Sequence, residues 1–430
     1  MRIFLTTLGC KVNQYESQVI LEIITNNGYT KENNLEKSDI IIINSCAVTS
    51  ESYKKVKKIL NQARKKNPLS IIVLLGCIPQ ALPEKTLYLV EADIIIGNSN
   101  KFDILKYIEK FIITKEKIID IIPFNSCQNK LLNSGIKKFN KKTRAFVKIE
   151  DGCDKFCSYC IIPYARGTIQ SKSIETLSTE VKGLVKTGFK EIVLIGINLC
   201  AYGQDIGITL CDAIETVCNI PEVQRVRLGS LDPDQLNLDI IQRLSKQKKL
   251  CPQFHLSLQS GCDQTLQRMS RRYITQEFEK IVDSLRNNFE NSSITTDIMV
   301  GFAGESDEEF KISLDFVRKI KFAQSHVFPY SIRPGTKAAT FDNHVDDKIK
   351  KIRSKEMLDL TDNLKNEFLR NQIGSIQSIL FEKINENGLI QGYSENYTLV
   401  CIDSEENIIG KILNVKITDS KDGFCIGKLI

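Results

Sequence analysis

The sequence predicts a multidomain α/β protein with three folded parts. These are an N-terminal open parallel α/β sheet, a central (β/α)6 partial barrel and a small C-terminal antiparallel β-barrel. Three observations predict this. The 430 residues exceed what one hydrophobic core holds. Short apolar runs alternate with helical patterns over most of the chain, which is typical of parallel sheets. The last part changes to β-rich runs separated by Asn and Gly turns.

The first part, residues 1–125, contains three nearly continuous apolar runs, and each ends in a cysteine. The runs are RIFLTTLGC, DIIIINSC and SIIVLLGC, which end at Cys10, Cys46 and Cys77. Such runs form strands that are buried on both faces of a parallel sheet, and their carboxyl ends lie on one edge. One cysteine there is an ordinary buried hydrophobe. Three at consecutive strand ends indicate a shared metal site.

Residues 126–142 are polar and basic, so we expect a linker there, with Cys127 as an incidental thiol. Residues 143–370 then resume the alternation of strand and helix, which predicts a parallel barrel. The six strand-like runs cover residues 144–150, 191–197, 223–231, 253–261, 293–302 and 325–331. Residues 371–430, with runs such as SIQSILFEKI, predict the small closed barrel.

The stretch DGCDKFCSYC places Cys153, Cys157 and Cys160 directly after the first predicted barrel strand, where barrel active sites lie. Thiolates bind zinc or iron–sulfur clusters. A structural zinc site needs a fourth ligand, and the sequence offers no second C-x2-C pair and no nearby histidine. Three thiolates on a four-iron cluster instead leave one iron open to a small-molecule chelate.

Composition narrows the class of protein. The chain carries 14 Cys and no Trp. No apolar run approaches ~18 residues, so we expect no membrane span, and we expect no secretory signal. Cysteines in such a chain are more typical of metal binding or redox chemistry than of a disulfide framework. The formal net charge of +7 is concentrated in the N-terminal part and suits a polyanionic partner.

The C-x3-C-x-aromatic-C pattern resembles the radical S-adenosylmethionine (SAM) superfamily. The resemblance implies that Cys153, Cys157 and Cys160 hold a 4Fe–4S cluster, that SAM chelates the open iron, and that Tyr159 lies beside its adenine. Reduction of the cluster would then release a 5′-deoxyadenosyl radical. Gly196 and Asn198, in GINLCAYG after a predicted strand, are candidates for the cofactor pocket, although such a glycine also suits an ordinary turn.

Further motifs are similar to those of the methylthiotransferases. TLGCKVNQYES, NSCAVT and LGC resemble the N-terminal domain of that family, and IPYARG, HLSLQSG, QRMSRRY, TTDIMVGFAGE and FPYSIRPGTKAA agree with it. The resemblance implies that Cys10, Cys46 and Cys77 hold a second, auxiliary 4Fe–4S cluster. The C-terminal part resembles the RNA-binding TRAM barrel. The resemblance covers essentially the whole chain.

Within the family, CKVNQYES and RLGSLDPDQL resemble the branch that acts on N6-threonylcarbamoyladenosine (t6A) in tRNA, next to the anticodon. The implied activity is methylthiolation of C2 of this base at position 37. It implies a cytoplasmic monomer with tRNA as substrate, a flavodoxin or ferredoxin as electron donor and no membrane contact. The alternatives are a methylthiotransferase for N6-isopentenyladenosine in tRNA or for an aspartate of a ribosomal protein. A non-catalytic RNA-binding protein with structural zinc is a hypothesis from another class.

Candidates for RNA contacts are less specific. Arg166, Arg271 and Arg272 suit tRNA phosphates or ordinary surface salt bridges. Tyr393 and Tyr397 suit base stacking or packing of the C-terminal barrel. Two residues near predicted strand ends are candidates for polar pocket residues, namely Gln259 and Asp297.

Overall fold

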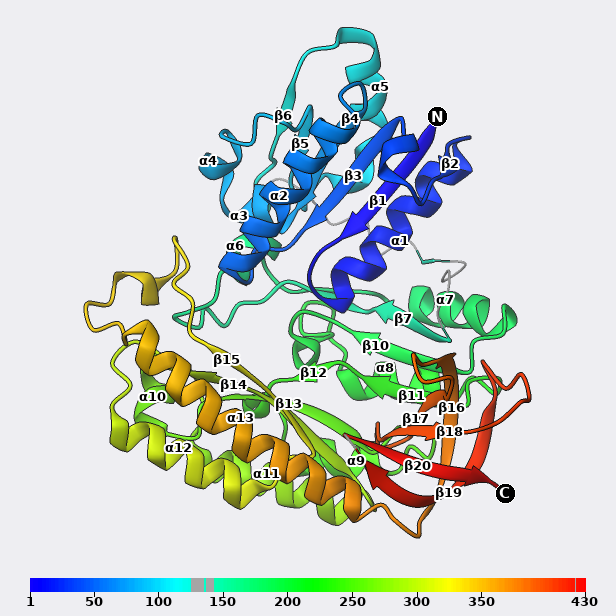
Figure 1. Cartoon of the computed structure of the whole chain (residues 1–430), viewed down its shortest axis with the longest axis vertical. Helices are drawn as coiled ribbons and strands as arrows, with labels where there is room; N and C mark the ends of the chain where they lie inside the picture. Colours follow the sequence, from blue (N-terminus) through cyan, green and yellow to red (C-terminus); the bar gives the residue numbers. More distant parts are fainter. Residues whose placement is uncertain (125–134, 137–142, 422) are drawn as a thin grey trace.

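The computed structural model describes residues 1–124, 135–136, 143–421 and 423–430. The predicted linker 126–142, with Cys127, therefore lies almost entirely outside the described residues. Figure 1 shows the N-terminal sheet at the top, the central parallel strands below it and the C-terminal barrel at the lower right.

The N-terminal domain is a six-stranded sheet in the order β2-β1-β3-β4-β5-β6, and every neighbouring pair is parallel. This confirms the predicted open α/β sheet. The strands are β1 (Arg2–Thr7), β2 (Thr30–Lys31), β3 (Ile40–Ser45), β4 (Ile71–Gly76), β5 (Ile94–Ile96) and β6 (Ile118–Asp120). The helices are α1 (Lys11–Asn26), α2 (Ser50–Lys66), α3 (Cys77–Ala81), α4 (Pro83–Thr86) and α5 (Ile104–Thr114).

Both faces of this sheet are buried, because successive strand residues point to opposite sides. Ile41 and Ile43 of β3 pack in a core that includes Val56 and Leu60 of α2. Their neighbours in β3 pack on the other face, in a core shared with α1 and α5. The strands therefore carry continuous apolar runs, as the sequence shows.

The central domain contains parallel strands in two adjoining sheets, β7-β10-β11 and β12-β13-β14-β15. The stretch Arg225–Leu231 supplies both β11 and β12, so six extended segments follow one another around an open barrel, as predicted. The strands are β7 (Arg144–Lys148), β10 (Glu191–Ile195), β11 (Arg225–Leu228), β12 (Ser230–Leu231), β13 (Gln253–Gln259), β14 (Ser293–Val300) and β15 (Gln324–Pro329). A short antiparallel pair joins β8 (Glu150–Asp151) to β9 (Gln170–Ser171).

Helices cover the outer face of these strands (Figure 1). They are α7 (Ile174–Lys186), α8 (Leu210–Cys218), α9 (Leu238–Ser245), α11 (Thr275–Asn288), α12 (Asp307–Ile320) and α13 (Asp347–Arg370), with the short α6 (Ile162–Arg166) and α10 (Asp263–Arg268) at the strand ends. No helix in the described ranges is long and apolar enough to cross a membrane.

The C-terminal domain is a closed barrel in the order β16-β17-β18-β20-β19. Its strands are β16 (Ile376–Ile384), β17 (Ile390–Ser394), β18 (Leu399–Ile402), β19 (Ile412–Lys421) and β20 (Phe424–Leu429). One pair, β18 with β20, is parallel, so the barrel is not antiparallel throughout.

Two tyrosines of this barrel face the central domain. The rings of Tyr393 and Tyr397 stack with centroids 4.4 Å apart. The Arg144 guanidinium lies over both rings, and that of Arg227 lies 4.8 Å from the Tyr397 centroid. Of the two interpretations open from the sequence, the structure supports packing, because arginines of the neighbouring domain already occupy these ring faces.

Candidate active site

The three N-terminal cysteines meet at one edge of their sheet. β1, β3 and β4 are neighbours, and Cys10, Cys46 and Cys77 follow their carboxyl ends. Asn13 lies among them, with its Oδ1 3.9 Å from Cys10 Sγ and 4.0 Å from Cys77 Sγ. The Asn13 amide also donates to two backbone carbonyls of the strand ends, at 2.8 and 3.0 Å. The fold thus brings together three cysteines that the sequence separates widely.

Gly9 permits the close approach of the first two loops. Its φ is +98°, and a Cβ on it would lie 2.6 Å from Cys46 Cβ and 2.7 Å from Cys46 Sγ. We expect Gly9→Ala to displace Cys46 and to destabilise the metal-free chain by more than the roughly 1–2 kcal/mol of left-handed backbone strain. Iron per chain after anaerobic reconstitution and thermal unfolding of the metal-free chain measure the two effects.

Gly28→Ala is the matched control for Gly9→Ala. Gly28 has a similar φ of +86°, but nothing lies within 4 Å of a Cβ built there. The control should show backbone strain alone and full iron. Equal iron contents in the two variants would mean that the contact with Cys46 is unimportant for the site.

A buried network of five charged side chains joins the N-terminal and central domains. Glu16 of α1 pairs with Lys101 at 2.6 Å, with Lys148 at 2.8 Å and with Arg166 at 2.5 Å. Lys148 also pairs with Asp151 at 2.5 Å. All five side chains are at most 5% exposed. Burial alone raises the pKa of Glu16, but the charges of Arg166, Lys101 and Lys148 outweigh it and hold this pKa well below its usual value.

Arg166 carries this network to the cysteines. Its guanidinium donates to Asn13 Oδ1, so a cation from α6 stands beside Cys10 and Cys77. The interpretation of Arg166 as a phosphate contact is wrong, because its side chain is 1% exposed and paired with Glu16.

The second cysteine set lies in the loop after β7 and β8. The loop begins at Gly152, whose φ of +92° and close packing on the Thr168 carbonyl exclude a side chain. Cys153 N donates to the Gly167 carbonyl at 3.0 Å, and Cys160 N donates to the Cys157 carbonyl at 2.9 Å. Burial raises the pKa of Cys153 and of Cys160 to about 12. These thiols therefore stay protonated until a metal displaces the proton.

Segments from the far side of the barrel hold the same loop. Ser158 N donates to the Met269 carbonyl at 3.0 Å, and Ser158 O accepts from Ala338 N at 2.7 Å. Tyr159 packs edge-to-face on Phe302, with ring centroids 6.4 Å apart. The ring is thus held in an apolar cluster directly beside Cys160.

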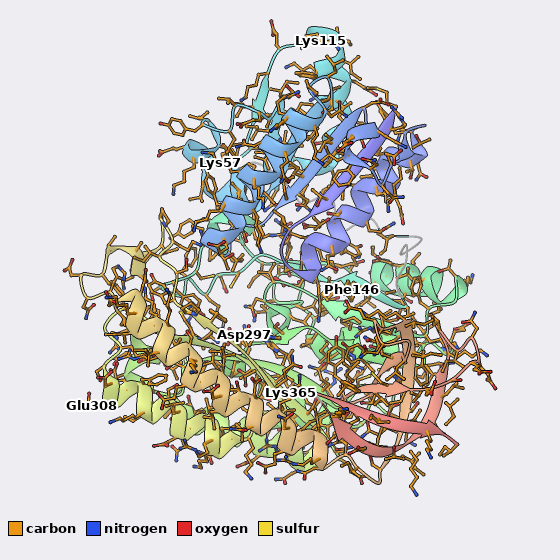
Figure 2. The ribbon with its side chains drawn as sticks, viewed as in Figure 1. Lys57, Lys115, Phe146, Asp297, Glu308 and Lys365 are labelled. Carbon is orange, nitrogen blue, oxygen red and sulfur yellow. The ribbon has the colours of Figure 1, made fainter. Side chains whose placement is uncertain are left out.

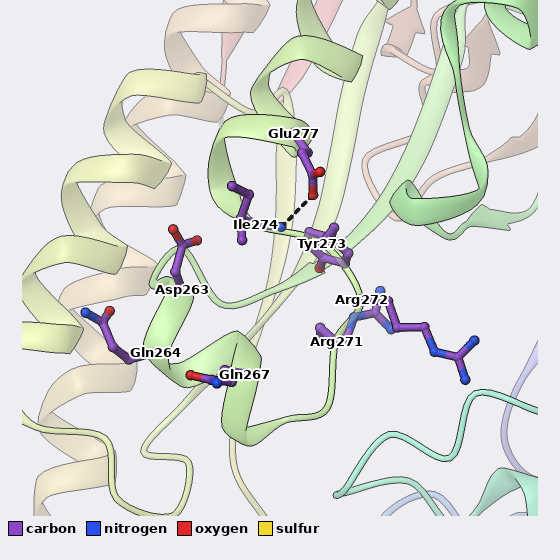
Figure 3. Close-up of a pocket in the computed structure, with 8 residues that line it drawn as sticks. All are labelled: Asp263, Gln264, Gln267, Arg271, Arg272, Tyr273, Ile274 and Glu277. Carbon is purple, nitrogen blue, oxygen red and sulfur yellow. Dashed lines mark hydrogen bonds between the residues drawn. The ribbon is translucent and has the colours of Figure 1, made fainter.

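Arg271 and Arg272 differ although they are adjacent. Arg271 donates to Cys157 Sγ at 3.5 Å and to Asp232 at 2.9 Å, and its side chain is 6% exposed. It is therefore part of the cysteine site and not a surface phosphate contact. Arg272 is exposed and extends away from the α10–α11 segment (Figure 3). It borders a polar cavity of about 500 Å³, lined by Asp263, Gln264, Gln267, Arg271, Arg272, Tyr273, Ile274 and Glu277.

Gly196 and Asn198 both contact Glu150, which the sequence did not single out. A Cβ on Gly196 would lie 2.5 Å from Glu150 Oε2, and this oxygen accepts from Asn198 N at 2.8 Å. Burial, followed by the charge of Asp151, raises the pKa of Glu150 well above its usual value. Among the described residues, Glu150 Oε1 and Asn198 Nδ2 are buried without a hydrogen-bond partner. Two such atoms, one of them in a carboxyl group whose charge acts on Cys153, fit a polar ligand.

Asp297 and Gln259 lie on the neighbouring strands β14 and β13. Asp297, near the centre of the molecule in Figure 2, pairs with His255 Nε2 at 3.3 Å. Gln259 ends β13 with a φ of +70°, which strains a residue other than glycine. Both stay candidates for pocket residues.

Three family models match the chain in succession. They are "Uncharacterized protein family UPF0004" at residues 2–97, the Radical SAM superfamily at residues 147–317 and the TRAM domain at residues 370–430. The threonylcarbamoyladenosine tRNA methylthiotransferase MtaB of Bacillus subtilis is 32% identical to this chain, over 96% of it and 92% of the relative. MtaB of Thermotoga maritima is 36% identical, over 96% and 93%. The chain belongs to the radical SAM methylthiotransferase family.

Family members named for another substrate are about equally similar to this methylthiotransferase. The tRNA-2-methylthio-N(6)-dimethylallyladenosine synthase of Pelotomaculum thermopropionicum is 33% identical, over 96% of this chain and 94% of the relative. Among solved structures, the radical SAM methyltransferase TsrM of Kitasatospora setae superposes with a TM-score of 0.60 at 10% identity, over 79% of this chain and 77% of TsrM. The likeness to TsrM shows the fold alone.

Family membership makes this protein a radical SAM-dependent transferase. It implies SAM and a 4Fe–4S cluster as cofactors. The donor set fits a cluster, because the described cysteines are free thiols and three of them lie on the loop that follows the first barrel strand.

Proposed function

We propose that this methylthiotransferase replaces the C2 hydrogen of t6A at position 37 of tRNA by a methylthio group, giving ms2t6A, with the help of two 4Fe–4S clusters. The observation that carries the proposal is the pair of cysteine sets, three thiols each, at the carboxyl ends of two parallel sheets. Asn13 and Arg166 connect the two sheets at this edge. An adenine between the sets would have access to both.

Each cysteine set is proposed to bind one cluster. Cys153, Cys157 and Cys160 would hold the cluster that binds SAM, and Cys10, Cys46 and Cys77 would hold the auxiliary one. Three thiols suit a four-iron cluster, because each binds a different iron.

When bound, SAM and its cluster would supply the radical chemistry that removes the C2 hydrogen. Side-chain acids and bases cannot do this, because C2 carries no leaving group. The protein provides the geometry. Glu150 and Asn198 would bind polar groups of SAM through their free oxygen and amide nitrogen. Tyr159, fixed against Phe302, would lie beside the adenine of SAM. Arg271 orients Cys157 through its 3.5 Å contact.

The t6A branch is supported by the CKVNQYES motif and by the names of the MtaB relatives, which are 32–36% identical. Relatives named for the dimethylallyl substrate are 31–33% identical. The alternative is therefore a methylthiotransferase for N6-isopentenyladenosine in tRNA or for an aspartate of a ribosomal protein. The proposal includes a cytoplasmic monomer that receives electrons from a flavodoxin or ferredoxin.

Purified tRNAs that carry either t6A or N6-isopentenyladenosine test the branch. The reconstituted enzyme is incubated with each tRNA, SAM, dithionite and sulfide, and the nucleosides are separated by liquid chromatography with mass spectrometry. We expect the methylthio product from t6A tRNA only. Product from the isopentenyl substrate alone would establish the alternative, and product from neither tRNA would count against both tRNA branches.

Arg272 is the exposed candidate for a tRNA phosphate. We expect Arg272→Glu to weaken tRNA binding and to lower the salt dependence of binding by about one phosphate contact. SAM cleavage without tRNA should stay unchanged, since Arg272 is exposed and the contact with Cys157 comes from Arg271. Filter binding at several salt concentrations measures this effect. Lys311→Glu, at an exposed position of α12 near Glu308, which Figure 2 labels, is the charge-matched control.

A further inference from the structure

Arg333 is a buried cation without an acidic partner. It lies in the loop after β15 and is 5% exposed. Its Nε donates to the Val48 carbonyl at 2.8 Å, and its Nη2 is buried without a hydrogen-bond partner in the described structure. No carboxylate within the described ranges forms an ion pair with Arg333.

The loop of Arg333 lies between the two cysteine sets. Val48 is the second residue after Cys46, so the guanidinium stands beside the N-terminal set. Farther along the loop, Ala338 N donates to Ser158, between Cys157 and Cys160. The loop is stiffened locally, because Thr336 donates to the Arg333 carbonyl through both its N and its Oγ1, at 3.1 and 2.7 Å.

Arg166, at the same site, is a buried arginine whose charge is compensated by acidic partners. It pairs with Glu16 and Asp151, and it donates to Asn13. Arg333 has none of these partners. Burial lowers its pKa, and the proximity of Cys46 opposes that shift. A buried charge is strongly disfavoured unless an anion or hydrogen bonds compensate it. The free Nη2 therefore points to an anion that joins the site.

The anion must be small, because a guanidinium that is 5% exposed is out of reach of an RNA backbone phosphate. It must also be compatible with the thiols of Cys46 and its partners. The proposed function requires an incoming sulfur species, and we place it at this set because the other set is assigned to SAM. Hydrosulfide and small alkanethiolates are anions of suitable size and charge.

Resting on the proposed function, we propose that Arg333 binds the incoming anionic sulfur compound, a hydrosulfide or small alkanethiolate, at the Cys10–Cys46–Cys77 site. Arg333 is a positioning residue that holds the anion by charge and by an Nη2–H···S hydrogen bond. The anion keeps its own bonds in this step. With the cluster present, its sulfur would donate an electron pair to the iron that three thiols leave open, and no electron or leaving group is transferred.

Anion binding to the auxiliary cluster alone tests this role. The variant with Cys153, Cys157 and Cys160 all changed to Ala is reconstituted anaerobically, and its reduced cluster is titrated with sodium sulfide or sodium methanethiolate by EPR and visible absorption. Adding Arg333→Gln should weaken binding of both anions about 10- to 100-fold, the range for a charge-assisted hydrogen bond. Arg333→Lys should restore most of it. Imidazole, a neutral iron ligand, should bind all forms alike.

The controls separate this role from others. Unchanged sulfide affinity in Arg333→Gln overturns the inference, and an equal loss of imidazole affinity shows a structural role and also overturns it. Thermal unfolding of the metal-free chains gives an independent readout. Removal of an uncompensated charge should leave the melting temperature unchanged or higher, whereas a fall would indicate a structural arginine. If the parent triple variant holds no iron, the auxiliary cluster of the proposed function fails instead.

Discussion

Replacing Cys153, Cys157 and Cys160 together by alanine is expected to lower the iron content from about eight to about four per chain and to abolish SAM cleavage, because each set is proposed to hold its own cluster. Replacing Cys10, Cys46 and Cys77 should also leave about four irons, but it should preserve SAM cleavage and abolish methylthiolation. Iron and sulfide analysis with Mössbauer spectroscopy gives the counts, and chromatography of 5′-deoxyadenosine gives the cleavage.

The matched control is a triple change of buried cysteines outside both sets, Cys211, Cys218 and Cys251, to alanine. Cys211 and Cys218 belong to α8 and Cys251 lies just before β13, so the iron content should stay at its parent value. Four irons in the parent chain and none after loss of Cys153, Cys157 and Cys160 would eliminate the auxiliary cluster. The N-terminal cysteines would then be packing residues, and the methylthio step would lack its second site.

Glu16→Gln is expected to destabilise the metal-free protein by about 3–5 kcal/mol, the usual effect of breaking a buried ion network by removing one partner. The loss leaves Asp151 as the one carboxylate, among the described residues, that pairs with Lys148 and Arg166. Denaturant unfolding measures it. Glu22→Gln, on the same helix but partly exposed, should change stability by under about 1 kcal/mol. Equal effects of the two changes would mean that the network contributes no special stability.

The same network makes the free energy of unfolding depend on pH in the acidic range. The pKa of Glu16 is held below its unfolded value, so its contribution is fully present above the unfolded carboxyl pKa, about 4.3. The contribution is lost as the pH falls from there through the lower folded pKa. Wild type should therefore lose more stability than Glu16→Gln below about pH 4. Parallel denaturation curves of the metal-free chains at pH 7, 5 and 3.5 test this expectation.

The features that could be predicted from the sequence are those that leave a pattern within one short segment of the chain. Strands buried on both faces leave continuous apolar runs, so the N-terminal sheet and the six barrel segments were predicted. Candidate cluster ligands within one loop, such as Cys153 and Cys160, show a recognisable spacing in the sequence. The N-terminal cysteines were recognisable because each one lies one to three residues after the end of an apolar strand.

Features that depend on pairing between distant segments were not predictable. Arg166 pairs with Glu16, which lies 150 positions earlier in the chain. The sequence around Arg166 therefore shows a basic residue but not its partner. Glu150 and Arg333 became notable only through their burial and through atoms without partners. Tyr393 packs against Arg144 of another domain. This contact depends on how the two domains dock, and the sequence around either residue does not show it.

The ion network also limits which domains of this protein can be replaced by the corresponding domains of a relative. Glu16 and Lys101 come from one domain, and Lys148, Asp151 and Arg166 come from the other, so neither half is a self-sufficient module. A chimera that took only the N-terminal domain from a relative would place foreign side chains against a buried guanidinium and a buried ammonium group. We expect such hybrids to be soluble only when the interface positions are transplanted together, so these two domains should be inherited as a unit.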